Sequence, residues 1–346
     1  MLSSVFGAWL IVGLFIDGWA HNHQKPETIF TPWHLALYSG FAACALYAVA
    51  IVRKAHVPGM SVWDAAPVGH ALVLVGVGVF GAGASADLAW HSLFGIEAGL
   101  DALLSPSHLV MFTGALLMLT GPFRAGWADG RLQAPTLRQF LPTLLSLALA
   151  MALAAFFFQY VNPLRRDDYG TWVSAYATFV TRFQGAADGL VENIQIVGLT
   201  SVLITNLLFV APLLLVLRRW RPPFGTATVL FTALSALVGG LDAYARPWPL
   251  LAAAPAGLVA DGLIRRLRPG AARPWAAYAT AAATSAALWL AFFGVYHVAY
   301  GIGCTAELWA GSIVVAAISA FAVAVLVFPP RIPVPVPAPA PAPAPA

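Results

Sequence analysis

The feature that most limits what this chain can fold into is a succession of long apolar segments separated by short polar ones. A helix that crosses a bilayer needs about 20 mostly apolar residues. Ten segments of the sequence approach that length, at 3–20, 33–52, 67–90, 107–123, 139–161, 192–217, 224–242, 248–264, 275–298 and 308–328. Prolines at 247, 249 and 255 interrupt the seventh and eighth segments, so these two are the weakest candidates. The pattern predicts an all-α polytopic membrane protein of about ten transmembrane helices, built from repeated helical hairpins.

The scarcity of charge supports the same fold class. Only 9% of the residues are charged and the mean hydropathy is +0.80, whereas soluble domains carry about 25% charged residues. So few charges cannot cover a water-exposed surface, and lipid is therefore the expected surrounding. The net charge is +4, but the basic residues form short clusters between apolar segments rather than one patch. Nucleic acid is therefore not an expected partner.

The distribution of Lys and Arg between the loops predicts how the chain sits in the membrane. Loops that face the cytoplasm carry an excess of these residues. Most of the basic residues fall in loops of one side, namely Arg53, Lys54, Arg124, Arg131, Arg138, Arg218, Arg219, Arg221, Arg265, Arg266, Arg268, Arg273 and Arg331. The other side holds Lys25, Arg165, Arg166, Arg182 and Arg246. We therefore expect a bacterial-type inner membrane protein with both termini in the cytoplasm.

Three regions are expected along the chain. Residues 1–125 contain tandem hairpins with candidate metal ligands, and residues 138–328 form a second bundle of transmembrane helices whose role the sequence does not assign. Residues 329–346 are a Pro-Ala and Pro-Val repeat, which predicts a disordered, extended tail. The longest outer loop, roughly 162–191, contains an amphipathic stretch from Trp172 to Phe183 that is expected to lie on the membrane surface.

Two segments of the first region resemble one another. The segment from Asp17 to Gly40 reads DGWAHNHQKPETIFTPWHLALYSG, and the segment from Asp87 to Gly114 reads DLAWHSLFGIEAGLDALLSPSHLVMFTG. Both begin Asp-x-x-x-His, and both close with Thr or Ser, Pro, one further residue, His and Leu. The second Asp follows the first by 70 residues, which is the length of a helical hairpin with its return loop. The pattern predicts a repeated two-helix unit.

The spacing within each segment predicts that three donor side chains meet. Asp17 and His21 are four residues apart, so they share one face at the end of a helix. Pro32 suits the first turn of the following helix, which puts His34 at the same depth after the loop folds back. Asp87, His91 and His108 repeat the arrangement. Near them, His23, Glu97 and Asp101 are candidates for additional ligands or for supporting contacts.

Two imidazoles and one carboxylate suit several metals. Non-haem iron, copper and zinc all accept these donors, so donor type does not choose among them. An ionised Asp close to apolar surroundings costs several kcal/mol (roughly 3 or more) unless it is paired or coordinated. Two such residues in matching positions indicate a function. A proton relay, or a buried Asp-His pair that locks each hairpin, is the alternative without metal.

The two motifs resemble the copper-binding integral membrane subunit of the particulate methane and ammonia monooxygenases, the copper membrane monooxygenase family. The intervals of the first motif, Asp17 to His21 and His21 to His34, match the copper-binding Asp-His-His motif of that family. The family carries a second motif about 70 residues later that opens with Asn-x-x-x-His, where this chain has Asp87 and His91, and Glu97 matches an acidic residue of that motif. The resemblance covers roughly residues 1–120. It implies copper at the first triad, a second metal site, and a membrane-embedded oxidising centre.

Three functions follow as alternatives. The first is a copper-dependent membrane oxidoreductase, or a subunit of one, that acts on a small hydrophobic substrate with O2 near the extracytoplasmic face. Its partners would be other monooxygenase-type subunits or further copies of this chain. The second is a non-enzymatic copper acquisition or insertion factor. The third is a metal transporter, although transport sites lie near the membrane midplane and these triads are expected near its outer surface.

A further Asp-x-x-x-basic spacing occurs outside this region. Asp242 and Arg246 are four residues apart at the end of the seventh apolar segment, with Arg where the triads have His. We expect them to form an ion pair that locks the turn.

Overall fold

The computed structural model describes residues 1–26, 28, 30–95, 99–165, 188–302 and 304–330. In this part of the chain the secondary structure is helical, apart from an isolated bridge between Gly270 and Arg273. The expected all-α fold is therefore confirmed. Glu97, the stretch from Trp172 to Phe183 and the tail from residue 331 lie outside the described residues.

Eight helical segments of the described chain are long and apolar enough to cross a membrane, and the protein is a multi-pass membrane protein. They are α1 (Leu2–Asn22), α2 (Pro32–Ala55), α4 (Ala71–Phe94), α6 (Pro106–Leu119) continued by α7 (Gly121–Ala128), α8 (Leu137–Phe157), α10 (Asp188–Arg219), α14 (Pro274–Tyr300) and α15 (Ala306–Val327). The remaining elements are α3 (Val62–Ala65), α5 (Leu100–Leu103), the 3-10 helix η1 (Gln159–Val161), α11 (Thr226–Gly240), α12 (Pro247–Leu251) and α13 (Ala253–Leu267).

The two weakest predicted spans are the ones that fall short. Helices α11 and α13 have 15 residues each, which at 1.5 Å per residue gives about 22 Å against a hydrocarbon core of about 30 Å. The apolar segment 224–242 does not stay helical to its end, because α11 stops at Gly240 and the chain turns. Two of the intervening prolines fall in the separate short helix α12. The expectation of ten full-length spans is thus not confirmed.

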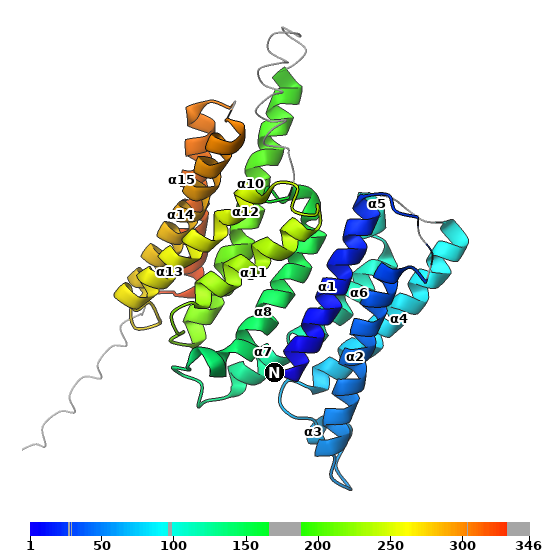
Figure 1. Ribbon diagram of the computed structural model, residues 1–346. Helices are drawn as coiled ribbons and strands as arrows, with labels where there is room; N and C mark the ends of the chain where they lie inside the picture. Colours follow the sequence, from blue (N-terminus) through cyan, green and yellow to red (C-terminus); the bar gives the residue numbers. More distant parts are fainter. Residues whose placement is uncertain (27, 29, 96–98, 166–187, 303, 331–346) are drawn as a thin grey trace, which may run out of the picture.

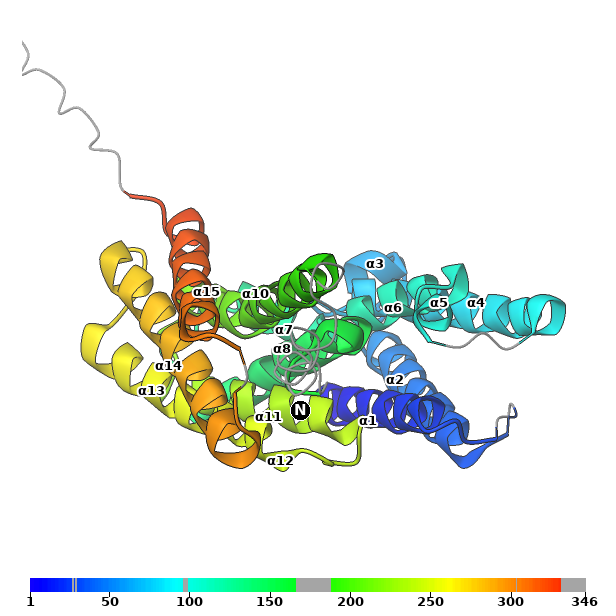
Figure 2. The same ribbon diagram turned by 90° about the horizontal axis from the view of Figure 1, so that it is seen from above.

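The first four long helices form two hairpins that lie together at one side of the molecule, α1 with α2 and α4 with α6 (Figures 1 and 2). Helix α8 packs against α1, α6 and α7, and also against α10 and α11, so it joins the hairpins to the rest of the bundle. Helices α13, α14 and α15 lie at the opposite side in Figure 2.

Glycines allow the two helices of each hairpin to approach closely. A side chain at Gly13 would come within 2.8 Å of the backbone of Ala36 and Leu37. A side chain at Gly40 would come within 2.7 Å of the backbone of Leu10. Such small-residue contacts are the usual means by which membrane helices pack closely, because lipid gives no hydrophobic drive to associate.

The second hairpin uses glycines at the equivalent positions. Gly83, 70 residues after Gly13, would bring a side chain within 2.9 Å of the backbone of Met111. Gly114, 74 residues after Gly40, lies against the backbone of Phe80. The repeat is therefore a repeat of backbone packing as well as of donor residues.

The C-terminal bundle buries polar groups that satisfy one another. The Asn206 side chain of α10 is fully buried and donates to the Ala316 carbonyl at 2.9 Å, while its oxygen accepts from Ser285 at 2.8 Å and from the Trp289 indole at 3.2 Å. These bonds tie α10 to α14 and α15. The Asp261 carboxylate of α13 is also buried and accepts from the first backbone amides of α11, which caps that helix.

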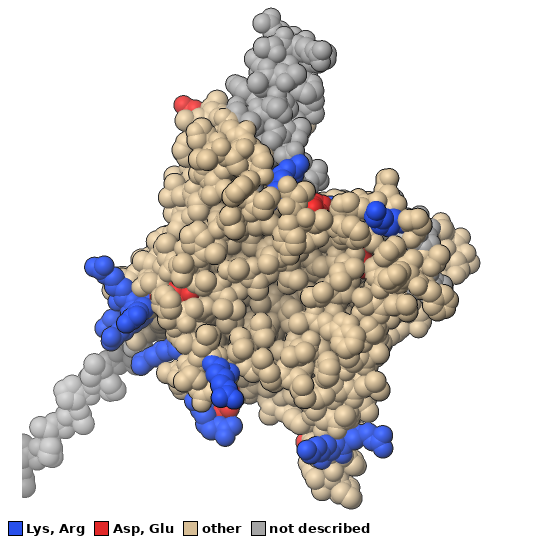
Figure 3. Space-filling view, viewed as in Figure 1, with Lys and Arg blue, Asp and Glu red and all other residues tan. Residues whose placement is uncertain are grey.

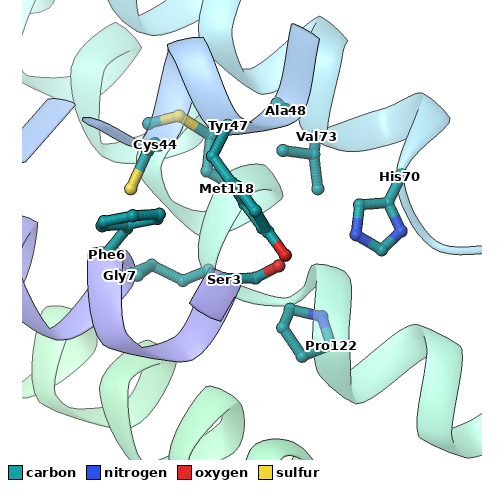
Figure 4. Close-up of a pocket in the computed structure, with 11 residues that line it drawn as sticks. Ser3, Phe6, Gly7, Cys44, Tyr47, Ala48, His70, Val73, Met118 and Pro122 are labelled. Carbon is teal, nitrogen blue, oxygen red and sulfur yellow. The ribbon is translucent and has the colours of Figure 1, made fainter. Parts of the chain in front are cut away.

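A small cavity of about 20 Å³ lies among α1, α2, α4 and α6, lined in part by Cys44, Tyr47, His70 and Met118 (Figure 4). It holds about one water molecule. Figure 4 shows the imidazole of His70 on the opposite side of the cavity from the sulfur atoms of Cys44 and Met118. The soft donors of this cavity are therefore not gathered around one point.

Charge is distributed unevenly along the molecule. Most of the Lys and Arg side chains visible in Figure 3 lie toward its lower end, where α1 and α4 begin and α2 ends. The opposite ends of the hairpins, where the predicted donors lie, are at the top in Figure 1. This arrangement agrees with the loop charges on which the predicted topology depends.

Candidate metal centre

Each hairpin brings one carboxylate and two imidazoles together at its tip. Asp17 and His21 occupy the last turns of α1, and His34 occupies the first turn of α2 after Pro32. Asp87 and His91 occupy the last turns of α4, and His108 lies in the first turn of α6. In both groups one ligand atom from each residue lies within 4.8 Å of those of the other two. The six predicted ligands thus form two separate triads, each drawn from a single hairpin.

The internal distances of the two triads are nearly the same. One oxygen of Asp17 lies 3.1 Å from Nε2 of His34, and the other lies 3.6 Å from Nε2 of His21. The corresponding distances from Asp87 are 3.3 Å to His108 and 3.4 Å to His91. The imidazole rings are 6.0 Å apart in the first triad and 6.2 Å apart in the second.

These separations fit a shared metal ion. Two ligand atoms that are each about 2.0–2.2 Å from one ion at a tetrahedral angle are about 3.3–3.6 Å apart. The carboxylate-to-imidazole distances span that interval and fall slightly below it. The side chains are also partly exposed, from 12% for Asp17 to 37% for His21, so an ion can reach them from outside the protein.

The hydrogen bonds of the imidazoles decide which nitrogen is available. Nδ1 of His34 lies 2.8 Å from the Thr28 carbonyl, and Nδ1 of His108 lies 2.5 Å from the Ala102 carbonyl. A carbonyl oxygen only accepts, so Nδ1 carries the proton in both residues. Both carbonyls belong to the residue six positions earlier, which makes this contact part of the repeat. His91 makes the equivalent bond to the Gly95 carbonyl at 3.1 Å.

A consequence follows for the other ring nitrogen. In a neutral imidazole with the proton on Nδ1, Nε2 presents a lone pair. In these three residues that lone pair faces an anionic carboxylate oxygen at 3.1–3.4 Å. A lone pair and a carboxylate repel unless a cation lies between them. A second proton on each ring or one metal ion per triad satisfies this requirement, and the single ion does so without placing two imidazolium charges side by side.

The two triads differ in the hydroxyl groups that support them. In the first, the Thr31 hydroxyl lies 2.9 Å from Nδ1 of His34 and so supports an imidazole. In the second, the Ser107 hydroxyl donates to Asp87 at 2.7 Å and so supports the carboxylate. Such contacts orient ligands and tune their donor strength.

Tyr38 lies between the triads. Its ring stacks on His34 with centroids 5.9 Å apart, and it interacts electrostatically with both Asp17 and Asp87. His21 likewise interacts with His91, His108 and Asp87 of the second triad. Charge that is bound at one triad is therefore felt at the other. The position of Tyr38 in the second hairpin is taken by Phe112.

The three additional candidates do not join the triads in the described part of the chain. His23 bonds through Nδ1 to the Trp19 carbonyl at 2.8 Å and stacks on the Trp19 indole. Asp101 is exposed on α5, and Glu97 is not among the described residues. The contacts that sequence reasoning missed are the two backbone carbonyls and the hydroxyls of Thr31 and Ser107. The hydroxyls were marked only by a Thr or Ser shortly before each closing His.

Comparison of the chain with protein-family models, with curated proteins and with solved structures gives no match in any of the three. The function is therefore argued from the geometry of the triads and from the motif resemblance.

Proposed function

We propose that the chain is an integral membrane metalloprotein in which each Asp-His-His triad binds one copper ion. We propose further that it is a membrane oxidoreductase, or the metal-bearing subunit of one, that acts on a small hydrophobic substrate with O2. The observation that carries the proposal is the orientation of the imidazoles. Three Nδ1 atoms are committed to carbonyl oxygens, and the Nε2 atoms converge on a carboxylate. The resemblance to the copper-binding membrane subunit of the particulate monooxygenases favours copper over zinc and iron.

The residues of each triad divide the tasks of a metal site. The imidazoles are neutral donors, and Asp17 or Asp87 supplies the negative charge that balances the cation. Three ligands from helix tips leave coordination positions free. Copper bound there would supply redox chemistry with O2. The carbonyls of Thr28 and Ala102 hold the imidazoles in the required tautomer before the ion arrives.

The surroundings of the triads suit an apolar substrate. Large hydrophobic side chains beside the ligands are strongly exposed, including Phe30 at 79%, Leu93 at 76% and Phe94 at 66%. A hydrophobic molecule dissolved in the bilayer therefore reaches the hairpin tips without crossing a polar layer. Mutating the ligands would abolish turnover, whereas shortening Leu93 would change the preferred substrate.

Metal content tests the proposal directly. We expect protein purified aerobically in mild detergent to bind two copper ions per chain, measured by elemental analysis. Copper(II) with imidazole ligands gives nitrogen hyperfine structure in electron paramagnetic resonance, and the double variant Asp17→Asn/Asp87→Asn should lose it. The variant Asp64→Asn is the matched control, because it removes an exposed carboxylate that bonds only to Ser61 among the described residues. Wild-type protein without metal after copper addition would contradict the proposal.

The proposed topology places the triads at the extracytoplasmic face of a bacterial inner membrane, with both termini in the cytoplasm. Single cysteines at Lys25 and Arg131 test it in a background without Cys44 and Cys304. A membrane-impermeant maleimide should label Lys25→Cys in intact spheroplasts and Arg131→Cys only after lysis. The native Cys304 is a poor probe, because burial raises the pKa of its thiol and keeps it protonated at neutral pH.

The exposure of His21 favours a second candidate, a copper acquisition or insertion factor. A ligand that is 37% exposed permits an ion to be handed to another protein. The two functions separate in one pair of measurements. An oxidoreductase consumes O2 when a short-chain alkane and a reductant are added, either alone or with co-purified partner subunits. An insertion factor instead loses copper to a chelator within seconds and shows no substrate-dependent O2 consumption.

A further inference from the structure

A cavity of about 300 Å³ lies at the same end of the molecule as the triads, beside the tip of α1. Its walls come from segments far apart in the sequence. His23 follows α1, Arg165 follows η1, and the turn from Asp242 to Arg246 links α11 to α12. The volume is at the lower limit of small-molecule sites, which measure about 300–1,000 Å³. Among the described residues that line this cavity, none belongs to either triad.

The charged side chains of the cavity favour an anion. The described residues that line it include Arg165, Arg246 and Asp242, so the formal charge is positive with His23 neutral. The Arg165 side chain is only 10% exposed. A guanidinium at this depth is expensive to bury unless its donors are used.

The partner of Arg165 uses only part of its donor capacity. Nε of Arg165 donates to Asp242 at 3.3 Å, and the guanidinium lies over the Tyr160 ring at 5.7 Å. Among the described residues its two terminal amino groups have no acceptor. The expected ion pair of Asp242 with Arg246 is replaced by this longer-range one, because α11 ends at Gly240 and the two residues do not share a helical face.

The backbone beside the arginines is held in an uncommon conformation. Ala243 and Tyr244 have positive φ angles of 51° and 57°, which non-glycine residues adopt rarely and at a cost of about 1–3 kcal/mol each. Tyr244, Trp248 and Leu251 are more than half exposed around this turn. Aromatic side chains in such positions mark the level of lipid headgroups.

We propose that this cavity binds a phosphate group, held by the guanidinium groups of Arg165 and Arg246. Two arginines match the geometry of phosphate oxygens, and the volume accommodates a phosphate with a small substituent. The same chemistry is presented by the headgroup of an anionic phospholipid and by free inorganic phosphate. The exposed aromatic and leucine side chains beside the turn suit the acyl chains of a lipid.

Thermal unfolding of the full-length protein in detergent, at constant ionic strength, tests the site. Three ligands are titrated: short-chain phosphatidylglycerol, phosphatidylcholine with the same acyl chains, and inorganic phosphate. We expect phosphatidylglycerol to raise the unfolding temperature in a saturable way. Phosphatidylcholine should give less than one tenth of that apparent affinity. An effect of inorganic phosphate at millimolar concentration would identify the soluble anion as a ligand, and stabilisation by phosphatidylglycerol alone would identify the lipid.

Variants assign the effect to the cavity. Arg246→Gln and Arg165→Gln should each weaken binding of the active ligand about tenfold, as expected when one charge-assisted interaction is lost. Arg138→Gln is the matched control, because it removes an exposed arginine near the start of α8, far from the cavity. Asp242→Asn keeps an acceptor for Nε of Arg165 but removes a negative charge, so it should tighten binding at least threefold. Arg246 is at the surface of the cavity, so Arg246→Gln remains informative if Arg165→Gln does not fold.

Two results would overturn the proposal. The first is unchanged affinity in Arg246→Gln together with unchanged or weaker affinity in Asp242→Asn. The second is equal stabilisation by phosphatidylglycerol and phosphatidylcholine, or none by any of the three ligands.

Discussion

The two triads have the same three donors at nearly the same distances, yet each is stabilised in a different way. In the first, a hydroxyl supports the imidazole of His34 and an aromatic ring stacks on it. In the second, a hydroxyl supports the carboxylate of Asp87, whose side chain is more exposed than that of Asp17, 18% against 12%. The comparison teaches that the repeat preserves the donors and the backbone while the supporting side chains have diverged. We therefore expect two metal sites of unequal affinity, with the first the tighter.

Removing a carboxylate gives the largest expected effect and tests whether the sites are independent. Asp17→Ala should weaken metal binding at the first triad more than about 100-fold, because loss of a ligand exceeds the 10- to 100-fold typical of its supporting groups. The second triad should change by less than about threefold, since all its ligands come from another hairpin. Asp87→Ala should give the mirror result. Isothermal titration with copper at a fixed chelator concentration measures both, and loss of both sites in either variant would contradict independence.

Separating the helices of one hairpin gives the next largest effect. Gly83→Ala places a methyl group within 2.9 Å of the Met111 backbone, which should destabilise the protein by about 1–3 kcal/mol and weaken the second triad. Gly78→Ala on the same helix is the control, because nothing lies within 4 Å of its added methyl group. Thermal unfolding and metal titration of both variants should separate packing from helix propensity. Equal behaviour of the two would show that close approach of the helices does not position the ligands.

The supporting hydroxyls should give a smaller and site-specific effect. Ser107→Ala should weaken the second triad about tenfold and leave the first unchanged, because the carboxylate loses the donor that orients it. Thr31→Ala should do the same at the first triad only. Thr31 makes no side-chain bond that caps α2, so its effect is not one of helix stability. The nitrogen hyperfine couplings of bound copper report which ligand has moved, and identical spectra would contradict the assigned roles.

Making the first hairpin resemble the second gives the smallest effect. Tyr38→Phe reproduces the Phe found at position 112 and keeps the ring that stacks on His34. We expect the copper affinity of both triads to stay within about threefold of wild type. A change of tenfold or more in titrations of the purified variant would show that the hydroxyl, rather than the ring, connects the triads.

The sequence was most informative where side chains alone determine the structure. The apolar segments predicted the helical membrane fold, and the Asp-x-x-x-His and Pro-x-His elements named all six residues that gather at the hairpin tips. The glycines at 13 and 83 also repeat, but their role appears only when the opposing backbones are seen. The bonds from His34 and His108 end on backbone carbonyls, which any residue supplies, so no residue type marks them.

The errors of prediction have a common physical origin in long-range contacts. The spacing of Asp242 and Arg246 suggested a local pair, but the helix ends before it and Asp242 pairs with Arg165, 77 positions earlier. The two short helices α11 and α13 are also sustained by tertiary packing, with the buried Asp261 capping one from the other. Hydropathy along the sequence measures apolar length and does not register such partners.

Drawing every ligand of a triad from one hairpin has an evolutionary consequence. A duplicated hairpin arrives with its metal site already complete, so the second copy works without any new interface being formed. Either copy can then change its ligands, or lose them, while its twin retains the ancestral chemistry. The chain is in this sense modular, and its two hairpins are free to specialise for different metals or for different roles with the same metal.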